Sequence, residues 1–144
     1  MKHRLLTCAM VLTALLLTAA PASAEAAFFP VRTYGGQFVD VPAREWYYDN
    51  VKALYELGLT SGQDQTHFSP ASSMTAAEAM AMAARLRSLH DWADAEAGPA
   101  QYSPGGAWYS PYTAYLGALS VVYGDFLRDP ERDITRAELA HVLA

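Results

Sequence analysis

The stretch that decides the fold is WYYDNVKALYELGLTSG, residues 46–62, because it recurs as WYSPYTAYLGALSVVYG at residues 108–124. The two copies align without a gap at an offset of 62 residues, from Trp46 to Trp108, and both end on glycine. In the first copy the apolar residues recur at three- and four-residue steps, the spacing of one face of a helix. The chain is therefore a tandem repeat whose unit contains a helix near its start.

The match continues past the glycine at an offset of 60 residues, where MTAAE meets ITRAE. In both motifs a threonine stands three residues before a glutamate, which predicts a capping box at the start of a helix. The motifs differ after the threonine, where the first copy has Ala76 and the second has Arg136. We assign the structural role of helix capping to four residues: Thr75, Glu78, Thr135 and Glu138.

Each copy is predicted to form a helix, a loop and a second helix. The first loop is rich in turn-forming residues, and Gly58 before it has the position of a left-handed helix cap. The second helix of the first copy is expected to reach about Leu89, with one apolar stripe made of Ala79, Met82, Leu86 and Leu89. Upstream, residues 38–41 predict at most a brief extended segment, ended by Pro42. The fold class is mainly α.

The N-terminus predicts a secretory signal peptide at residues 1–24. Lys2 and Arg4 precede an apolar run of about 15 residues, and Ala22-Ser23-Ala24 is a small-residue cleavage signal. The run is short for a bilayer-spanning helix, although a retained membrane anchor is the alternative. The single cysteine, Cys8, lies inside this run, so the mature chain has no disulfide and no cysteine ligand.

The mature chain, residues 25–144, is the size of one domain and is acidic. Its net charge falls from −5 to −7 once Lys2 and Arg4 are removed, which disfavours nucleic acid and anionic lipid as partners. His67, His90 and His141 are scattered, and no catalytic spacing stands out. We therefore expect no metal, no cofactor, no enzymatic activity, and no membrane contact after signal cleavage.

The first copy closely resembles the S-layer homology (SLH) repeat of bacterial surface proteins. That repeat opens on Phe-x-Asp-Val, continues with a tryptophan, a helix, Gly-x-x-x-Gly and Phe-x-Pro, and closes on Ile-Thr-Arg-Ala-Glu. Ten positions of this chain fit: Phe38, Asp40, Val41, Trp46, Gly58, Gly62, Phe68, Pro70, Thr75 and Glu78. The second copy keeps Trp108, Gly124 and the full ITRAE motif but lacks the Phe-x-Asp-Val opening and the Phe-x-Pro.

The resemblance implies a domain order, which we predict as a leader at 25–37, SLH repeat 1 at 38–90, a connection at 91–107, and SLH repeat 2 at 108–144 with a degenerate start. It further implies tandem helix-loop-helix repeats that form part of a three-repeat, pseudo-threefold helical spindle. Two repeats cannot close such a spindle. We therefore expect an exposed apolar face on the last helix, self-association that covers it, or a third repeat in a longer chain.

The resemblance also implies that the chain is secreted to the bacterial cell wall or cell surface and binds secondary cell-wall polysaccharide, often pyruvylated, in grooves between repeats. The implied polysaccharide-binding residues are Arg136, Trp46, Trp108, Gly62 and Gly124. An arginine at a helix N-terminus can hold a ketal carboxylate through two parallel hydrogen bonds. Ala76 cannot, which leaves open whether repeat 1 binds at all.

Each of these binding roles has an alternative explanation that involves no ligand. Arg136 could be a solvent-exposed residue paired with Glu131 or Asp133, and the two tryptophans could be core or half-buried packing residues. The two glycines could be backbone requirements of their loops. Two further functions remain open: a structural or protein-interaction module that keeps the SLH fold without glycan binding, and the targeting end of a longer exocellular enzyme.

Overall fold

The computed structural model describes residues 28–102, 105–121 and 127–144; the expected signal peptide and Gly124 lie outside these residues. Within them the protein is helical, and Thr75 and Asp133 form one isolated antiparallel bridge. The elements are α2 (Tyr48–Glu56), α3 (Ala76–Trp92), the 3₁₀ turn η1 (Pro99–Gln101), α4 (Ser110–Ala118) and α6 (Arg136–Leu143). The predicted mainly α class is confirmed.

The predicted helices are present with shifted ends. The helix α2 begins two residues after Trp46, and Gly58 follows it with a φ of +76°, as its expected capping role requires. The helix α3 runs three residues past the expected end at Leu89 and stops where Ala93 has a φ of +54°. The brief extended segment at 38–41 is wrong, because the Val41 N–H donates to the Phe38 carbonyl at 3.1 Å and the chain turns there.

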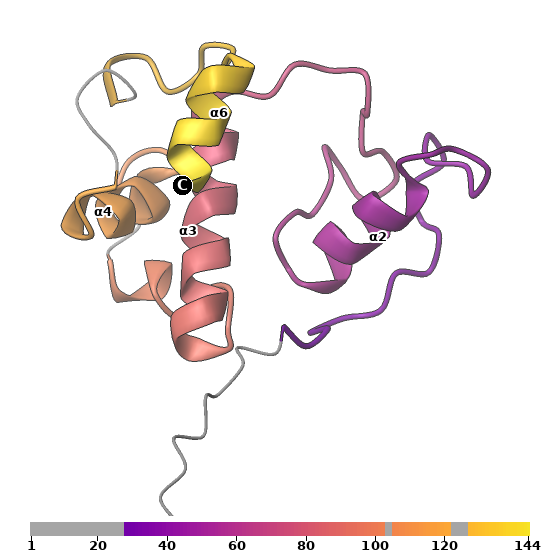
Figure 1. Ribbon diagram of the computed structural model, residues 1–144, viewed down its shortest axis with the longest axis horizontal. Coiled ribbons are helices and arrows are strands. Elements are labelled where there is room, and N and C mark those ends of the chain that lie inside the picture. The colour runs from indigo at the N-terminus through magenta and orange to yellow at the C-terminus, as the bar shows by residue number, and fades with distance from the viewer. Residues whose placement is uncertain (1–27, 103–104, 122–126) are drawn as a thin grey trace, which may run out of the picture.

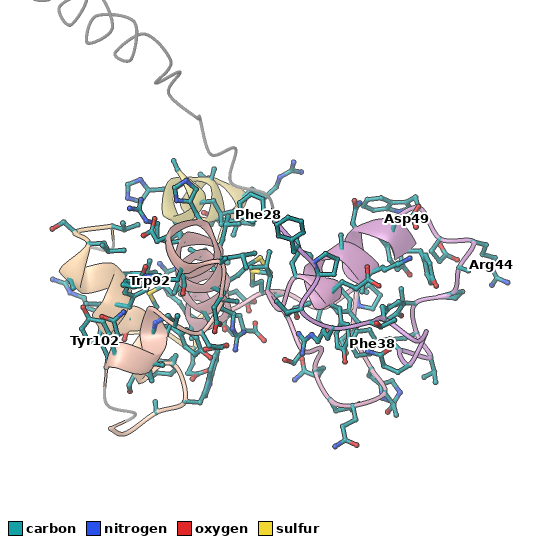
Figure 2. All side chains as sticks on the ribbon, turned by 90° about the horizontal axis from the view of Figure 1, so that it is seen from below. Phe28, Phe38, Arg44, Asp49, Trp92 and Tyr102 are labelled. Atoms are coloured by element: carbon teal, nitrogen blue, oxygen red, sulfur yellow. The ribbon has the colours of Figure 1, made fainter. Side chains whose placement is uncertain are left out.

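Two apolar clusters organise the molecule, one at α2 and one among α3, α4 and α6, which lie on opposite sides of Figure 1. The first, which we call the aromatic cluster, surrounds α2 and buries Tyr34, Phe38, Val41 and Val51 beneath further rings. Phe38 lies 5.6 Å from the Tyr55 ring, edge to face, a favourable aromatic geometry. Figure 2, seen from below, shows Phe38 in the α2 part and Trp92 and Tyr102 on the opposite part of the molecule.

The second cluster, the helical cluster, joins α3, α4 and α6 through Ala76, Met80, Ala83, Ala84, Tyr115, Leu116 and Val142. It crosses the sequence repeat, since α3 belongs to the first copy whereas α4 and α6 belong to the second. The predicted stripe on α3 is wrong in part: Met82 and Leu86 are half-buried, whereas Met80, Ala83 and Ala84 are buried. Contact with two helices buries more of α3 than one stripe.

The last helix keeps an apolar face open, as we expected. Val142 is buried, but Leu143 is 43% exposed, and Ala137 and Ala140 are also exposed. In α3 the residues 60 positions earlier, Ala77, Met80 and Ala83, are buried. The two copies of the second helix are therefore in different environments.

Candidate functional site

A groove of about 760 Å³ lies beside the connection between α2 and α3. Its walls come from the loop of residues 59–75, one side of α3, Trp108 just before α4, and Glu131. The loop crosses from α2 to α3 in Figure 1. The groove therefore takes residues from both sequence repeats.

Asp40 holds this loop through hydrogen bonds to its backbone. Its carboxylate accepts the backbone N–H groups of Phe68 at 2.9 Å and Ser69 at 2.7 Å. Burial opposes ionisation of Asp40, but the N–H groups of Phe68, Ser69 and Asp40 itself, together with the charge of His67, outweigh burial and hold the pKa of the carboxyl below its ordinary value. The Phe-x-Asp-Val motif thus serves the loop, with Phe38 in the aromatic cluster and Asp40 on the backbone of the turn.

Gly62 lines the groove and is also required by the backbone. Its φ is +82°, and a Cβ atom there would lie 2.6 Å from Phe38 Cε1 and 2.8 Å from the His67 carbonyl oxygen. The loop conformation alone accounts for this glycine. Its expected counterpart, Gly124, lies outside the described residues.

Trp46 and Trp108 occupy equivalent positions of the two sequence copies but lie in different surroundings. Trp108 is 53% exposed, lines the groove, and lies 5.6 Å from the Tyr109 ring and 6.4 Å from the Tyr112 ring. Trp46 is 84% exposed, contacts the Tyr47 ring at 5.5 Å, and does not line the groove. Neither tryptophan is in the core; the half-buried packing role fits Trp108 and not Trp46, and of the two only Trp108 lines the groove.

Arg85 is a groove residue that the sequence did not single out. Its guanidinium donates to Glu96 Oε1 at 2.7 Å and to the Tyr112 hydroxyl at 2.6 Å, and it lies over the Tyr112 ring. The arginine therefore ties α3 to the turn before η1 and to α4. Its partners are 11 and 27 residues away in sequence, so no local pattern indicates them.

Both helices that follow the repeated motif carry complete capping boxes. The Thr75 hydroxyl accepts from the Glu78 N–H at 3.2 Å, and the Glu78 carboxylate accepts from the Thr75 N–H at 2.8 Å. The second box has the same two bonds at the same lengths. Its glutamate is also held by a fork from Arg132, and these donors lower the pKa of Glu138 to about 2.

The N-termini of the same two helices differ sharply. At the start of α3, the Ala76 N–H donates to the Arg132 carbonyl at 2.9 Å and the Ala77 N–H to the Pro130 carbonyl at 2.7 Å. Ala76 is fully buried, so residues 130–132 close this end of α3. The first copy has no room for an arginine side chain at this position.

At the start of α6, Arg136 is exposed, and no described residue offers a carbonyl to the N–H groups of Arg136 and Ala137. The alternative pairing with Glu131 or Asp133 is not found among the described residues; the ion pair at this corner is Arg132 with Glu138, at 2.6 Å. Arg136 lies outside the groove lining. The bridge between Thr75 and Asp133 nevertheless places the segment before α6 beside the segment before α3.

In the ranges 28–102, 105–121 and 127–144, no group of three or more His, Cys, Asp or Glu side chains could hold a metal ion. No helix in this described part of the chain is long and apolar enough to cross a bilayer.

Comparison with known proteins identifies relatives of this chain. The family model described as "S-layer homology domain" matches residues 37–80. An "S-layer protein" of Bacillus thuringiensis subsp. finitimus and the "S-layer protein sap" of Bacillus anthracis are each 34% identical over 115 residues, which is 79% of this chain. An "Amylopullulanase" of Thermoanaerobacterium thermosulfurigenes is 29% identical over 117 residues, 77% of this chain and 6% of that protein.

The chain spans only 14% of the length of the two S-layer proteins, and no solved structure matches it. The matched residues 37–80 include the aromatic cluster apart from Tyr34, the groove loop and the capped start of α3. The chain therefore belongs to the S-layer homology family and is a secreted protein of the bacterial cell surface or cell wall.

Proposed function

We propose that the chain is a non-enzymatic module that anchors its polypeptide to the bacterial cell wall by binding secondary cell-wall polysaccharide non-covalently. The observation that carries this proposal is the inter-repeat groove beside the exposed Trp108, in a chain that belongs to the SLH family. A partly exposed indole on the wall of a groove offers a flat apolar face to a sugar ring.

Arg136 supplies a second contact in this proposal. Its guanidinium is exposed at the N-terminus of α6, where no described residue offers a carbonyl to the first two N–H groups, and these groups and the positive end of the helix dipole also favour an anion. A pyruvyl ketal carries a carboxylate, which a guanidinium can hold through two parallel hydrogen bonds. Ala76 offers neither a charge nor free N–H groups, so we assign the acidic contact to Arg136 alone.

The test is a pull-down of the mature chain with purified sacculi of a Gram-positive bacterium, before and after acid extraction of the secondary polymer. We expect binding to depend on the polymer and Arg136→Ala to weaken it by about tenfold, the worth of one charged hydrogen bond. Arg44→Ala is the matched control, because Arg44 is also exposed but lies in the α2 part (Figure 2). Binding that survives removal of the polymer would contradict the proposal.

A structural or protein-interaction module is the second candidate. The closed N-terminus of α3 and the open apolar face of α6 at Leu143 support it. Failure of the wild-type chain to bind intact sacculi would favour this candidate. A concentration-dependent mass in sedimentation would then indicate self-association through the α6 face, whereas a constant monomer mass would leave that face to a different protein.

A further inference from the structure

We propose that residues 28–34 form a strap that holds the groove loop, residues 59–75, in its observed conformation, and that Arg32 is the positioning residue of this strap. The strap lies outside residues 37–80, which the family model matches, so membership of the family does not account for it. Its role is to shape the groove, and this role is independent of which ligand the groove takes.

The helix α2 is too short to be stable on its own. It has nine residues, whereas an isolated helix needs about 12–15 residues in water. The last carbonyls of a helix also lack partners within it. The strap supplies such partners, because the N–H groups of Val31 and Arg32 donate to the Glu56 carbonyl at 2.8 and 3.3 Å. The end of α2 is therefore completed by a segment far upstream in the sequence.

Arg32 joins the end of α2 to the start of the groove loop. Its Nε donates to the Tyr55 carbonyl at 2.6 Å, and its Nη2 donates to the Thr60 carbonyl. The guanidinium also lies 3.9 Å from the centre of the Tyr55 ring, a cation–π contact. These contacts span the turn at Gly58, whose φ is +76°. They therefore fix the direction in which the loop leaves α2.

Thr60 is the residue through which the strap acts on the groove. Thr60 and the next two residues, Ser61 and Gly62, line the groove. The Thr60 Oγ1 accepts from the Gly62 N–H at 3.3 Å, so the position of Thr60 constrains that of Gly62. Moving the Thr60 carbonyl would therefore displace this wall of the groove.

Tyr34 anchors the strap in the aromatic cluster. It is only 7% exposed, and its N–H donates to the Glu56 carboxylate at 3.1 Å. Its ring centre lies within 5.8 Å of three other rings, those of Phe38, Tyr48 and Tyr55. The next two residues, Gly35 and Gly36, are exposed, and an added Cβ at either would have no neighbour within 4 Å. This glycine pair joins a well-anchored strap to the part of the chain that the family shares.

The strap also lies beside the end of α3. Val31 and Arg32 line a cavity of about 330 Å³ together with residues 93–96, which directly follow α3. In Figure 1 the strap is the indigo segment below α2, next to the lower end of α3. One short segment therefore reaches α2, the groove loop and the chain that follows α3.

The test is hydrogen exchange of the whole mature chain, measured by mass spectrometry, in Arg32→Ala. We expect exchange in residues 57–75 to be at least about tenfold faster than in the wild type, because the variant loses hydrogen bonds from a charged donor. Exchange in α4 should stay within about twofold. Arg44→Ala is the matched control, because Arg44 is exposed in the same part of the molecule (Figure 2) and pairs with its neighbour Glu45. It should leave exchange in residues 57–75 within about twofold.

The distribution of the effect separates positioning from general stability. A general loss of stability would speed exchange in α3, α4 and α6 as well, whereas release of the strap speeds it in α2 and the loop. Arg32→Lys keeps the charge but not the planar fork that reaches two carbonyls, so its exchange in the loop should be at least about threefold faster than in the wild type and slower than in Arg32→Ala. If Arg32→Ala does not fold, Arg32→Lys carries the same comparison.

Two outcomes would overturn the role of the strap: unchanged exchange of residues 57–75 in the Arg32 variants, or equal acceleration in the loop and in α4. The anchoring function fails separately. If the wild type does not bind sacculi but Arg32→Ala speeds exchange in the loop alone, anchoring is wrong and the strap stands. If the wild type binds sacculi and the Arg32 variants leave exchange in the loop unchanged, the strap is wrong and anchoring stands.

Discussion

Exchanging the residues that distinguish the two copies gives the sharpest test of the structure. Ala76→Arg places an arginine where Ala76 is fully buried and where residues 130–132 close the start of α3. Overpacking costs about 1–3 kcal/mol, and the two hydrogen bonds to Pro130 and Arg132 are worth about 0.5–1.5 kcal/mol each. Opening the segment would relieve the overpacking but break the two bonds, so either route costs about 1–3 kcal/mol of unfolding free energy.

The assay is urea unfolding followed by tryptophan fluorescence. For a slope of about 2 kcal/mol per molar urea, the midpoint of Ala76→Arg should fall by about 0.5–1.5 M. The control is Arg136→Ala, the reverse change at the equivalent but exposed position, which should stay within about 0.5 kcal/mol of the wild type. Equal midpoints for Ala76→Arg and the wild type would refute the packing of residues 130–132 on α3.

Three further predictions concern stability. Thr75→Ala and Thr135→Ala each remove a capping-box hydroxyl and should each cost about 1 kcal/mol in urea unfolding; no loss in either would contradict the observed boxes. Gly62→Ala should cost about 2–4 kcal/mol from left-handed backbone and overpacking, whereas Gly35→Ala, with nothing within 4 Å of the added Cβ, is the neutral control. The pKa of Glu138 is about 2 in the folded chain, against an ordinary value of 4.5. Its contribution to stability is therefore present above pH 4.5 and is lost as the pH falls toward 2. Between these two pH values, the melting temperature of Glu138→Gln should fall less than that of the wild type.

The helices could be predicted from sequence because their signals are local. A capping box needs only a threonine and a glutamate three residues apart, and the left-handed Gly58 follows directly from its place after the last helical turn. The predicted ends of α2 and α3 were less accurate, because the position of a helix end depends on which other segments of the chain pack against it. Trp46 precedes α2 although its spacing fits the helix.

The packing of α3 depends on residues far away in sequence. The predicted apolar stripe of α3 assumed that only one face of the helix is buried, but both α4 and α6 pack against α3. The run of alanines in α3 was the signal that could have indicated this, because small side chains let helices approach closely on several faces. A period of 3.6 residues identifies a helix, but it does not report how many neighbours the helix has.

The groove could be predicted only in part. The resemblance indicated Trp108 and Gly62, which do line it, but it treated Trp46 as equivalent to Trp108. The two tryptophans share a local sequence and differ in what stands opposite: Trp108 faces the loop of the preceding repeat, whereas Trp46 has no such loop before it among the described residues. Arg85 was missed because both of its partners are brought to it by tertiary folding.

The contrast between Ala76 and Arg136 now has a physical cause. Residues 130–132 of the second repeat supply the carbonyls that satisfy the first N–H groups of α3, and this closure buries position 76. No described residue does the same for α6, so position 136 faces solvent and can hold a large charged side chain. An arginine at position 76 would compete with the contact that joins the two repeats. The first copy therefore has the capping box of the shared motif but an alanine in place of the arginine, whereas the second copy has both the capping box and the arginine.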